Sequence, residues 1–340
     1  MINHMNKQLT KFVMTLILSA TIGVSWAQDP IFSQFYANPL YLNPALAGSA
    51  LTPRLTLNYR NQWPSLDANF VTYGASYDQY LPNINSGVGV SFITDRAGQG
   101  ALVNGGISAL YSYRLKLNRE MFVNFGVKAS FFQNKLDWNS LTWGDQYDPT
   151  RGLVFVTEET PPTSTSKSIV DFSAGAVYSY KDIFFGGIAV DHLTQPSNGF
   201  YDDKLSKLHI KTTIHAGAVI DLRNKRYRGA RYDRITVSPN IIYQQQQNFK
   251  QLNIGVYLNK NPFVIGTWYR HDVTNGDAVI VLLGFQHENL KFGYSYDITI
   301  SKLQNATGGA HEISVGYTFD TGSQYRSRRT RLDAIPSPSF

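Results

Sequence analysis

The chain has 340 residues, of which 16% are charged and 14% are aromatic, and it contains no cysteine. The low charge argues against a disordered chain, and the missing cysteine excludes disulfide scaffolds, thiolate metal sites and thiol catalysis. Many aromatic residues, 27 glycines and few charges favour strands that face lipid on one side and water on the other.

The first 27 residues have the features of a secretory signal peptide. Lys7 and Lys11 precede an apolar run over residues 12–24, and small residues stand at positions 25 and 27. We therefore expect export and cleavage after Ala27, with an uncleaved anchor as the alternative. The remainder has no apolar stretch of about 18 residues, so we expect no membrane-spanning helix there. Without the two lysines the formal net charge falls from +7 to +5.

Residues 28–50 are rich in apolar side chains but lack the alternation of a strand. Two Asn-Pro pairs, at 38–39 and 43–44, oppose a continuous helix. The apolar surface needs cover in water. We expect this segment to pack against or into the periplasmic mouth of a barrel as a plug or docking peptide; a simple lead-in to the first strand is the alternative. The candidate docking residues are Phe32, Tyr36, Asn38, Pro39, Tyr41, Asn43, Pro44 and Gly48.

Apolar and polar residues alternate through most of residues 51–320, as Leu55, Leu57 and Tyr59 do with their neighbours. Period two indicates strands with two unlike faces. Several stretches hold ten or more residues, which suits a tilted membrane-spanning strand of about 9–11 residues. We therefore predict an all-β protein, a closed antiparallel transmembrane β-barrel of about 14 strands. The expected strands are 52–61, 69–80, 86–94, 102–117, 121–135, 168–180, 183–192, 208–221, 233–244, 250–258, 262–270, 277–286, 289–300 and 310–320. Those at 183–192, 262–270 and 277–286 alternate poorly, which leaves their faces uncertain.

The connection lengths give the barrel an orientation. With the N-terminus in the periplasm, most turns on that side are short, and the longest connections, 136–167 and 193–207, fall outside. The basic connection 222–232 is long for the periplasmic side. The expected outer-loop partner surface is Arg60, Asn61, Gln62, Trp63, Pro64, Trp138, Trp143 and Tyr147. The expected periplasmic basic patch is Arg223, Lys225, Arg226, Arg228, Arg231 and Arg234, with a basic periplasmic tail over 321–340.

Charged side chains are expected on the inner face of the barrel. Either they line a solute channel, or they form a packed interior of paired charges and water. The expected interior set is Arg54, Arg60, Asp78, Arg114, Lys116, Lys128, Asp171, His209, Lys211, His215, Lys291, Asp297 and Glu312.

No local motif indicates catalysis. The histidines lie on different strands or turns, and no zinc-protease, serine-hydrolase or phosphate-loop pattern occurs. A hydrolytic site assembled across strands stays open as an alternative. We expect no enzyme activity, no catalytic, metal-binding or cofactor-binding residues, and no cofactor. An exported protein meets no genome, so we expect no nucleic-acid partner.

Five stretches together resemble one family. They are QDPIFSQFYANPLYLNPALAG (28–48), YRNQWPSL (59–66), FVTYGASYDQY (70–80), DFSAGAVYSYKDIFFGGIAVDHLTQP (171–196) and FGYSYDITISKLQNATGGAHEISVGYTF (292–319). The chain is similar in these stretches to the PorP/SprF outer-membrane proteins of Bacteroidetes, and the order of the motifs is intact. Residues 137–167 and 197–234 match nothing recognisable, so we expect partner specificity to lie there.

The resemblance implies a place in the type IX secretion system, at the outer membrane and cell surface. It implies support for secretion or surface anchoring of a large cargo with a type B C-terminal domain, such as a gliding-motility adhesin. The implied partners are this cargo, other type IX secretion components, outer-membrane lipid and a periplasmic complex near peptidoglycan. A solute channel or transporter is the alternative function.

Overall fold

The computed structural model describes residues 29–66, 68–98, 100–148, 150–181, 183–201, 206–222, 235–272, 276–301 and 307–320. The expected signal peptide, the basic patch within 223–234 and the tail over 321–340 lie outside these residues. No helix within the described ranges has the length and apolar character needed to cross a membrane.

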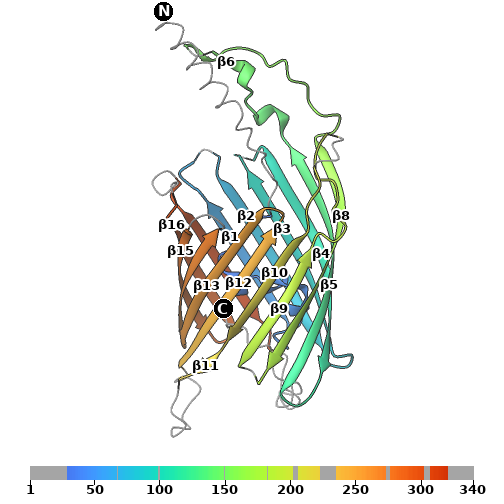
Figure 1. Ribbon diagram of the computed structural model, residues 1–340, viewed down its shortest axis with the longest axis vertical. Helices are drawn as coiled ribbons and strands as arrows, with labels where there is room; N and C mark the ends of the chain where they lie inside the picture. Colours follow the sequence, from blue (N-terminus) through green and yellow to red (C-terminus); the bar gives the residue numbers. More distant parts are fainter. Residues whose placement is uncertain are drawn as a thin grey trace, which may run out of the picture.

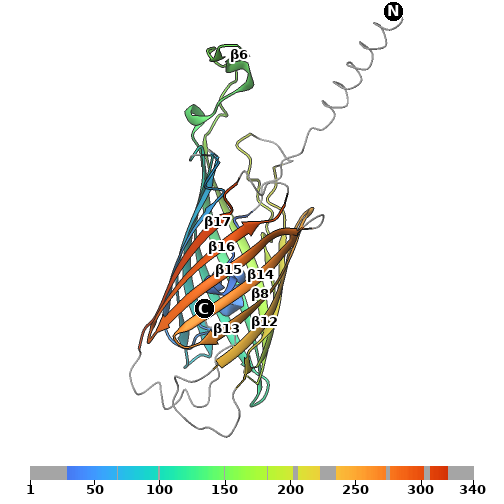
Figure 2. The same ribbon diagram turned by 90° about the vertical axis from the view of Figure 1, so that its left-hand side faces the viewer.

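The described strands confirm a closed antiparallel barrel of 14 strands, with β10 and β11 together forming one of them (Figures 1 and 2). Each barrel strand pairs with the next along the chain. The strand β1 also pairs with β17, which closes the cylinder. The barrel strands are β1 (Arg54–Gln62), β2 (Phe70–Leu81), β3 (Ser86–Ala97), β4 (Leu102–Lys116), β5 (Met121–Leu136), β8 (Ser166–Tyr180), β9 (Phe184–Asp191), β10 (Lys211–Ala218), β11 (Ile220–Asp221), β12 (Ile235–Gln246), β13 (Phe249–Lys260), β14 (Phe263–Asp272), β15 (Gly276–His287), β16 (Leu290–Thr299) and β17 (Ala310–Thr318).

The two faces of the wall differ as alternation predicts. On β1, Leu57 is 45% exposed on the outer face, whereas Thr56 and Asn58 are buried inside. The same division continues around the barrel, where large apolar side chains point outward from most strands. An outward apolar surface is stable in lipid and costly in water, so the fold suits a bilayer.

Two strands that alternate poorly in the sequence are apolar on both faces. Along β14 the inner face carries Val264 and Trp268, and along β15 it carries Ile280 and Leu282. Trp268 lies directly opposite Ile280 in the register of the two strands. This inner apolar wall packs against another part of the chain, described next, while the outer face meets lipid.

Residues 29–53, called the inner segment here, lie inside the barrel as the blue ribbon in both views (Figures 1 and 2). The segment contains three short helices, η1 (Phe35–Ala37), α2 (Pro39–Leu42) and η2 (Pro44–Leu46). Most of its residues are buried, and Leu40 and Ala45 have no exposed surface. The prolines open α2 and η2, where a missing N–H costs no hydrogen bond.

The barrel has one end with mostly short connections and one with longer loops. The turn end includes connections 82–85, 117–120, 261–262 and 288–289, and the loop end includes 137–165 and 192–210. The connection 137–165 rises above the rim (Figures 1 and 2) and contains the two-stranded β6 (Tyr147–Asp148) and β7 (Gly152–Leu153). By the rule for bacterial barrels, the turn end faces the periplasm.

Candidate functional site

The inner segment runs the whole way from the loop end to the turn end. At its start, Asp29 contacts His192 and Lys211, which follow β9 and begin β10 at the loop end. At its end, the Gly48 N–H donates to Asp78 of β2, close to the turn end. The expectation of a segment at the periplasmic mouth is therefore corrected, because the segment occupies the lumen and begins at the opposite mouth.

A buried ionic cluster ties the segment to the barrel wall. We call it the latch, and its members are Ser33, Arg60, Arg270, Asp297 and Glu312. Arg60 contacts Asp297 at 2.9 Å and Glu312 at 3.1 Å, and Arg270 contacts Asp297 at 3.0 Å. The hydroxyl of Ser33 donates to Asp297 at 2.6 Å. The four charged members come from β1, β14, β16 and β17, so the latch joins four strands to one segment residue.

Glu312 also holds the backbone of the inner segment. Its carboxylate accepts the N–H groups of Ser33, at 2.7 Å, and Gln34, at 3.1 Å. The side chain of Gln34 donates to the backbone carbonyl of Glu312 and accepts from the hydroxyl of Ser314. Charge-assisted bonds of this kind are stronger than neutral ones, and their burial makes the loss of one partner costly.

The segment's aromatic residues pack on the inner apolar wall. Phe35 lies 5.0 Å from Trp268 between ring centroids, and Tyr36 lies 5.7 Å from Phe185 and 6.5 Å from Tyr257. These rings form one buried cluster together with Ile280 and its neighbours. The candidate docking residues Phe32, Tyr36, Asn38, Pro39, Asn43, Pro44 and Gly48 are all buried in the lumen, and Tyr41 is partly buried.

Glycines in the wall make room for the segment. A Cβ at Gly126 of β5 would overlap the backbone of Pro44 and Ala45, and one at Gly175 of β8 would overlap Asn43. Asn43 in turn donates to backbone carbonyls of β8 and β9, at 3.3 Å from Ala176 and 3.1 Å from Ile188. The backbone of the segment therefore lies directly against the backbone of the wall at these two glycines.

Most of the expected interior charges do lie inside and are paired. The pairs outside the latch are Arg54–Asp78, Lys128–Asp191, Asp171–His192 and Lys211–Asp29. His215 contacts the amide of Asn43 at 3.2 Å, and the guanidinium of Arg114 stacks on Phe122. Lys291 is partly buried. One expectation is corrected, because Lys116 is exposed at the turn end of β4. His209 lies in the connection before β10 and is partly buried.

The expected outer-loop residues separate into three groups. Arg60 is 2% exposed because it belongs to the latch, so its assignment to the partner surface is corrected. Asn61 and Gln62 are the last residues of β1, and Trp63 and Pro64 follow in the first outer loop, where Trp63 packs on Phe70. The remaining three lie on the long connection 137–165.

That long connection is folded and presents apolar side chains. The rings of Trp138 and Trp143 lie with centroids 4.4 Å apart and are tilted by 35°. Asp145 accepts the N–H of Glu158 at 2.7 Å, and this bond lowers the pKa of the Asp145 carboxyl. Val156 is 88% exposed. Its apolar neighbours Tyr147, Leu153, Val154 and Phe155 are also exposed.

No group of three or more histidine and carboxylate side chains within the described ranges could hold a metal ion. The latch and the inner segment were not visible as a unit in the sequence. The signal that could have located them is the apolar inner face of β14 and β15, which has no role in a water-filled lumen.

Comparisons with known proteins give the family. The model of the type IX secretion system membrane protein PorP/SprF family matches residues 24–317. No curated protein matches the chain. Among solved structures, the chain is similar to a TodX deltaS2S3 mutant monoaromatic hydrocarbon channel, with 9% identity, a TM-score of 0.47, and coverage of 82% of this chain and 94% of that one. It is also similar to the P. putida toluene transporter TodX, with 10% identity, a TM-score of 0.44, and 82% and 93% coverage.

The closed barrel with its apolar outer belt defines an outer-membrane β-barrel protein whose lumen is occupied by its own N-terminal segment. The chain belongs to the PorP/SprF family of type IX secretion system membrane proteins.

The path of the inner segment predicts on which side of the outer membrane its first residue lies. Asp29 is held at the loop end, so an epitope peptide inserted between residues 28 and 29 should emerge outside the cell. We expect antibody to bind that epitope on intact cells. The same epitope inserted between Asn83 and Ile84, at the turn end, should bind only after the outer membrane is permeabilised. Binding at residue 28 only after permeabilisation would contradict the path.

Proposed function

We propose that this protein is a non-enzymatic component of type IX secretion that supports the secretion or surface anchoring of a large exported protein with a type B C-terminal domain, such as a gliding adhesin. The observation that carries the proposal, beside the family, is the occupied lumen. Interior side chains contact the inner segment in the latch and on the apolar wall. Because the inner segment fills most of the lumen, we expect a protein partner to bind the outer loops or the periplasmic end of the barrel.

The long connection 137–165 is the surface that best suits an extracellular partner. It rises above the rim (Figure 1) and exposes a run from Leu153 to Val156. Exposed apolar clusters on a folded loop mark protein-binding sites. The contact between the Trp138 and Trp143 rings is one that would be formed before a partner binds, which would reduce the ordering cost of binding.

The inner segment acts in this proposal as a plug that keeps the secretion barrel closed. Its burial leaves the docking motif inaccessible to a protein partner while the segment stays in the lumen. The basic residues of 223–234 and the tail remain the predicted contact with other type IX components and with a peptidoglycan-associated periplasmic protein.

The double variant Phe155→Asp and Val156→Asp tests the partner surface. Two carboxylates would oppose burial against an apolar partner, so we expect recovery of the bound exported protein to fall about tenfold or more, as the loss of a central contact does. The measurement is copurification with tagged barrel from its own outer membrane, followed by quantification of bound proteins.

Ile84→Asp is the matched control, because Ile84 is 54% exposed at the opposite end of the barrel. We expect it to leave recovery unchanged. Equal recovery from the loop variant and the wild type, with both barrels folded, would remove the loop from the proposal. A solute channel would instead show stable, solute-selective conductance from the full-length protein in a planar bilayer.

A further inference from the structure

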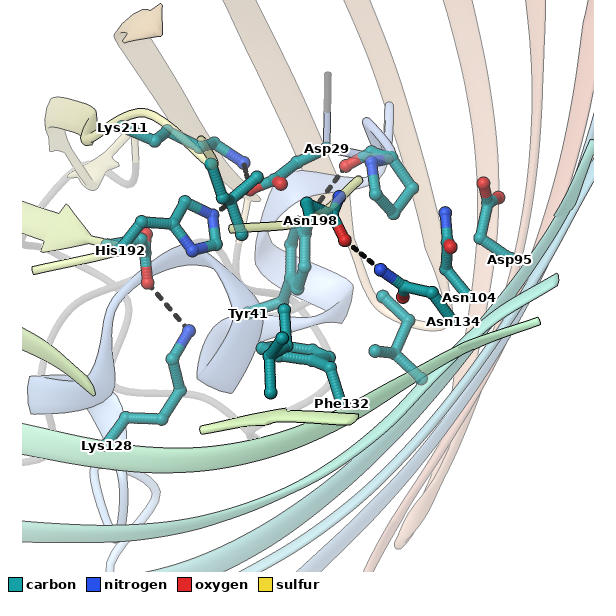
Figure 3. Close-up of a pocket in the computed structure, with 15 residues that line it drawn as sticks. Asp29, Tyr41, Asp95, Asn104, Lys128, Phe132, Asn134, His192, Asn198 and Lys211 are labelled. Atoms are coloured by element: carbon teal, nitrogen blue, oxygen red, sulfur yellow. Dashed lines mark hydrogen bonds and ion pairs between the residues drawn. The ribbon is translucent and has the colours of Figure 1, made fainter. Parts of the chain in front are cut away.

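A cavity of about 100 Å³ lies in the loop-end half of the lumen, above the inner segment (Figure 3). The inner segment lines it with Asp29, Pro30 and Tyr41. Its wall comes from strands β3, β4, β5, β8, β9 and β10, and the connection 192–210 contributes Asn198 and Leu208. The cavity therefore belongs to the outer side of the protein, separated from the turn end by the length of the inner segment.

The charges around this cavity do not balance. Lys128 pairs with Asp191 at 2.7 Å, and Lys211 pairs with Asp29 at 3.3 Å. His192 lies between Asp29 and Asp171. Even with His192 protonated, three cations meet four carboxylates when Asp95 is counted. The excess is one negative charge.

Asp95 carries that excess. Its Oδ1 accepts the hydroxyl of Thr72 at 2.5 Å, and no cation of the described ranges pairs with it. Asn104 lies directly opposite it in the β3–β4 register and also lines the cavity, so both side chains are on the inner face. Figure 3 shows Asp95 and Asn104 side by side on the wall away from the lysines.

Besides the paired charges and the Asn134–Asn198 amides, the lining also has apolar side chains. Ile93, Phe132 and Ile169 supply apolar surface to the same lining. A carboxylate beside an amide oxygen can accept the N–H donors of an ammonium group, and apolar walls suit the methylene stem that carries it. A divalent cation would require several more oxygen ligands than this wall offers.

We propose that this cavity binds an alkylammonium group that enters from outside the cell, with Asp95 as its counter-ion. The group can be carried by a lysine side chain of an exported protein or by a free small amine. This proposal can fail or succeed independently of the proposed role in secretion. The reason is that amine binding is measured on the purified protein, with no secreted partner present.

The test uses saturation-transfer NMR on the purified full-length barrel with three probes. These are N-acetyl-lysine N-methylamide, butylammonium and the uncharged N-acetyl-norleucine N-methylamide. We expect both amines to bind and the norleucine probe not to bind. About tenfold tighter binding of the lysine probe than of butylammonium assigns a protein side chain as the source, and equal binding assigns a free amine.

Two variants test the counter-ion. Asp95→Asn should weaken both amines about tenfold or more. Asn104→Lys keeps the carboxylate but supplies an internal ammonium from the facing strand, so it should also abolish binding while raising the melting temperature. Asp148→Asn, on the exposed loop hairpin, is the matched control and should bind as the wild type does. Absence of amine binding to the wild type, or binding unchanged in folded Asp95→Asn or in Asn104→Lys, would overturn the proposal.

Discussion

Deletion of residues 29–48 should convert the barrel from one with a filled lumen into an open pore. These residues fill the lumen from Asp29 at the loop end to Gly48 at the turn end, and the wall behind them is continuous. A 14-stranded cylinder is wide enough for a solute path once its contents are removed. Reconstitution in planar bilayers should show large, stable conductance steps that the full-length protein lacks.

An equally long deletion, residues 144–163, removes the tip of the outer connection and is the matched control, which should not conduct. Gly126→Leu gives a second route to the same result. Its side chain would occupy the space of Pro44 and Ala45, so it should displace η2 and raise conductance without shortening the chain. If both folded variants conduct no more than the full-length protein, the segment does not close the pore.

Arg60→Ala should cost more stability than any exposed ion-pair substitution. Among the described latch residues, Arg60 is the only cation that contacts both carboxylates, and its loss leaves Glu312 buried without a cation among the described residues. Breaking a buried pair in this way costs about 3–5 kcal/mol. The free energy of unfolding, measured with urea in detergent or lipid, should fall by that amount.

The control is Lys181→Ala, which removes the ion pair with Glu120 between two turns. Those side chains are 43% and 56% exposed and 3.4 Å apart, so the change should cost no more than about 1 kcal/mol. If Arg60→Ala lowered the free energy of unfolding by as little as Lys181→Ala does, the ion pairs of the latch would not behave as buried pairs.

The barrel could be predicted because lipid imposes a local rule. Every second side chain faces the bilayer, so strands such as β1 and β4 display the alternation in the sequence. The connection lengths then gave the two ends. Only small differences remain, such as the break between β10 and β11, where a single strand over 208–221 is expected.

The contents of the lumen could not be predicted by the same rule. The inner segment contacts residues that are far away in the sequence, as Ser33 does with Asp297 and Glu312. No local pattern indicates such contacts. The position of Arg60 is ambiguous in the sequence, because it has the spacing of an inner-face residue yet stands two residues before the end of β1. Whether Arg60 belongs to the inner face or to the outer loop is decided by its burial, and its burial depends on the segment that fills the barrel.

The latch also lies across the seam of the cylinder. Arg60 of β1 stands directly opposite Glu312 of β17, the first and last strands, and Ser33 and Gln34 bind the same carboxylate. A barrel that closes without the inner segment keeps the Arg60–Glu312 pair but lacks the bonds from Ser33 and Gln34 at this seam. A chain that lost residues 29–48 would therefore have fewer bonds holding its first strand to its last.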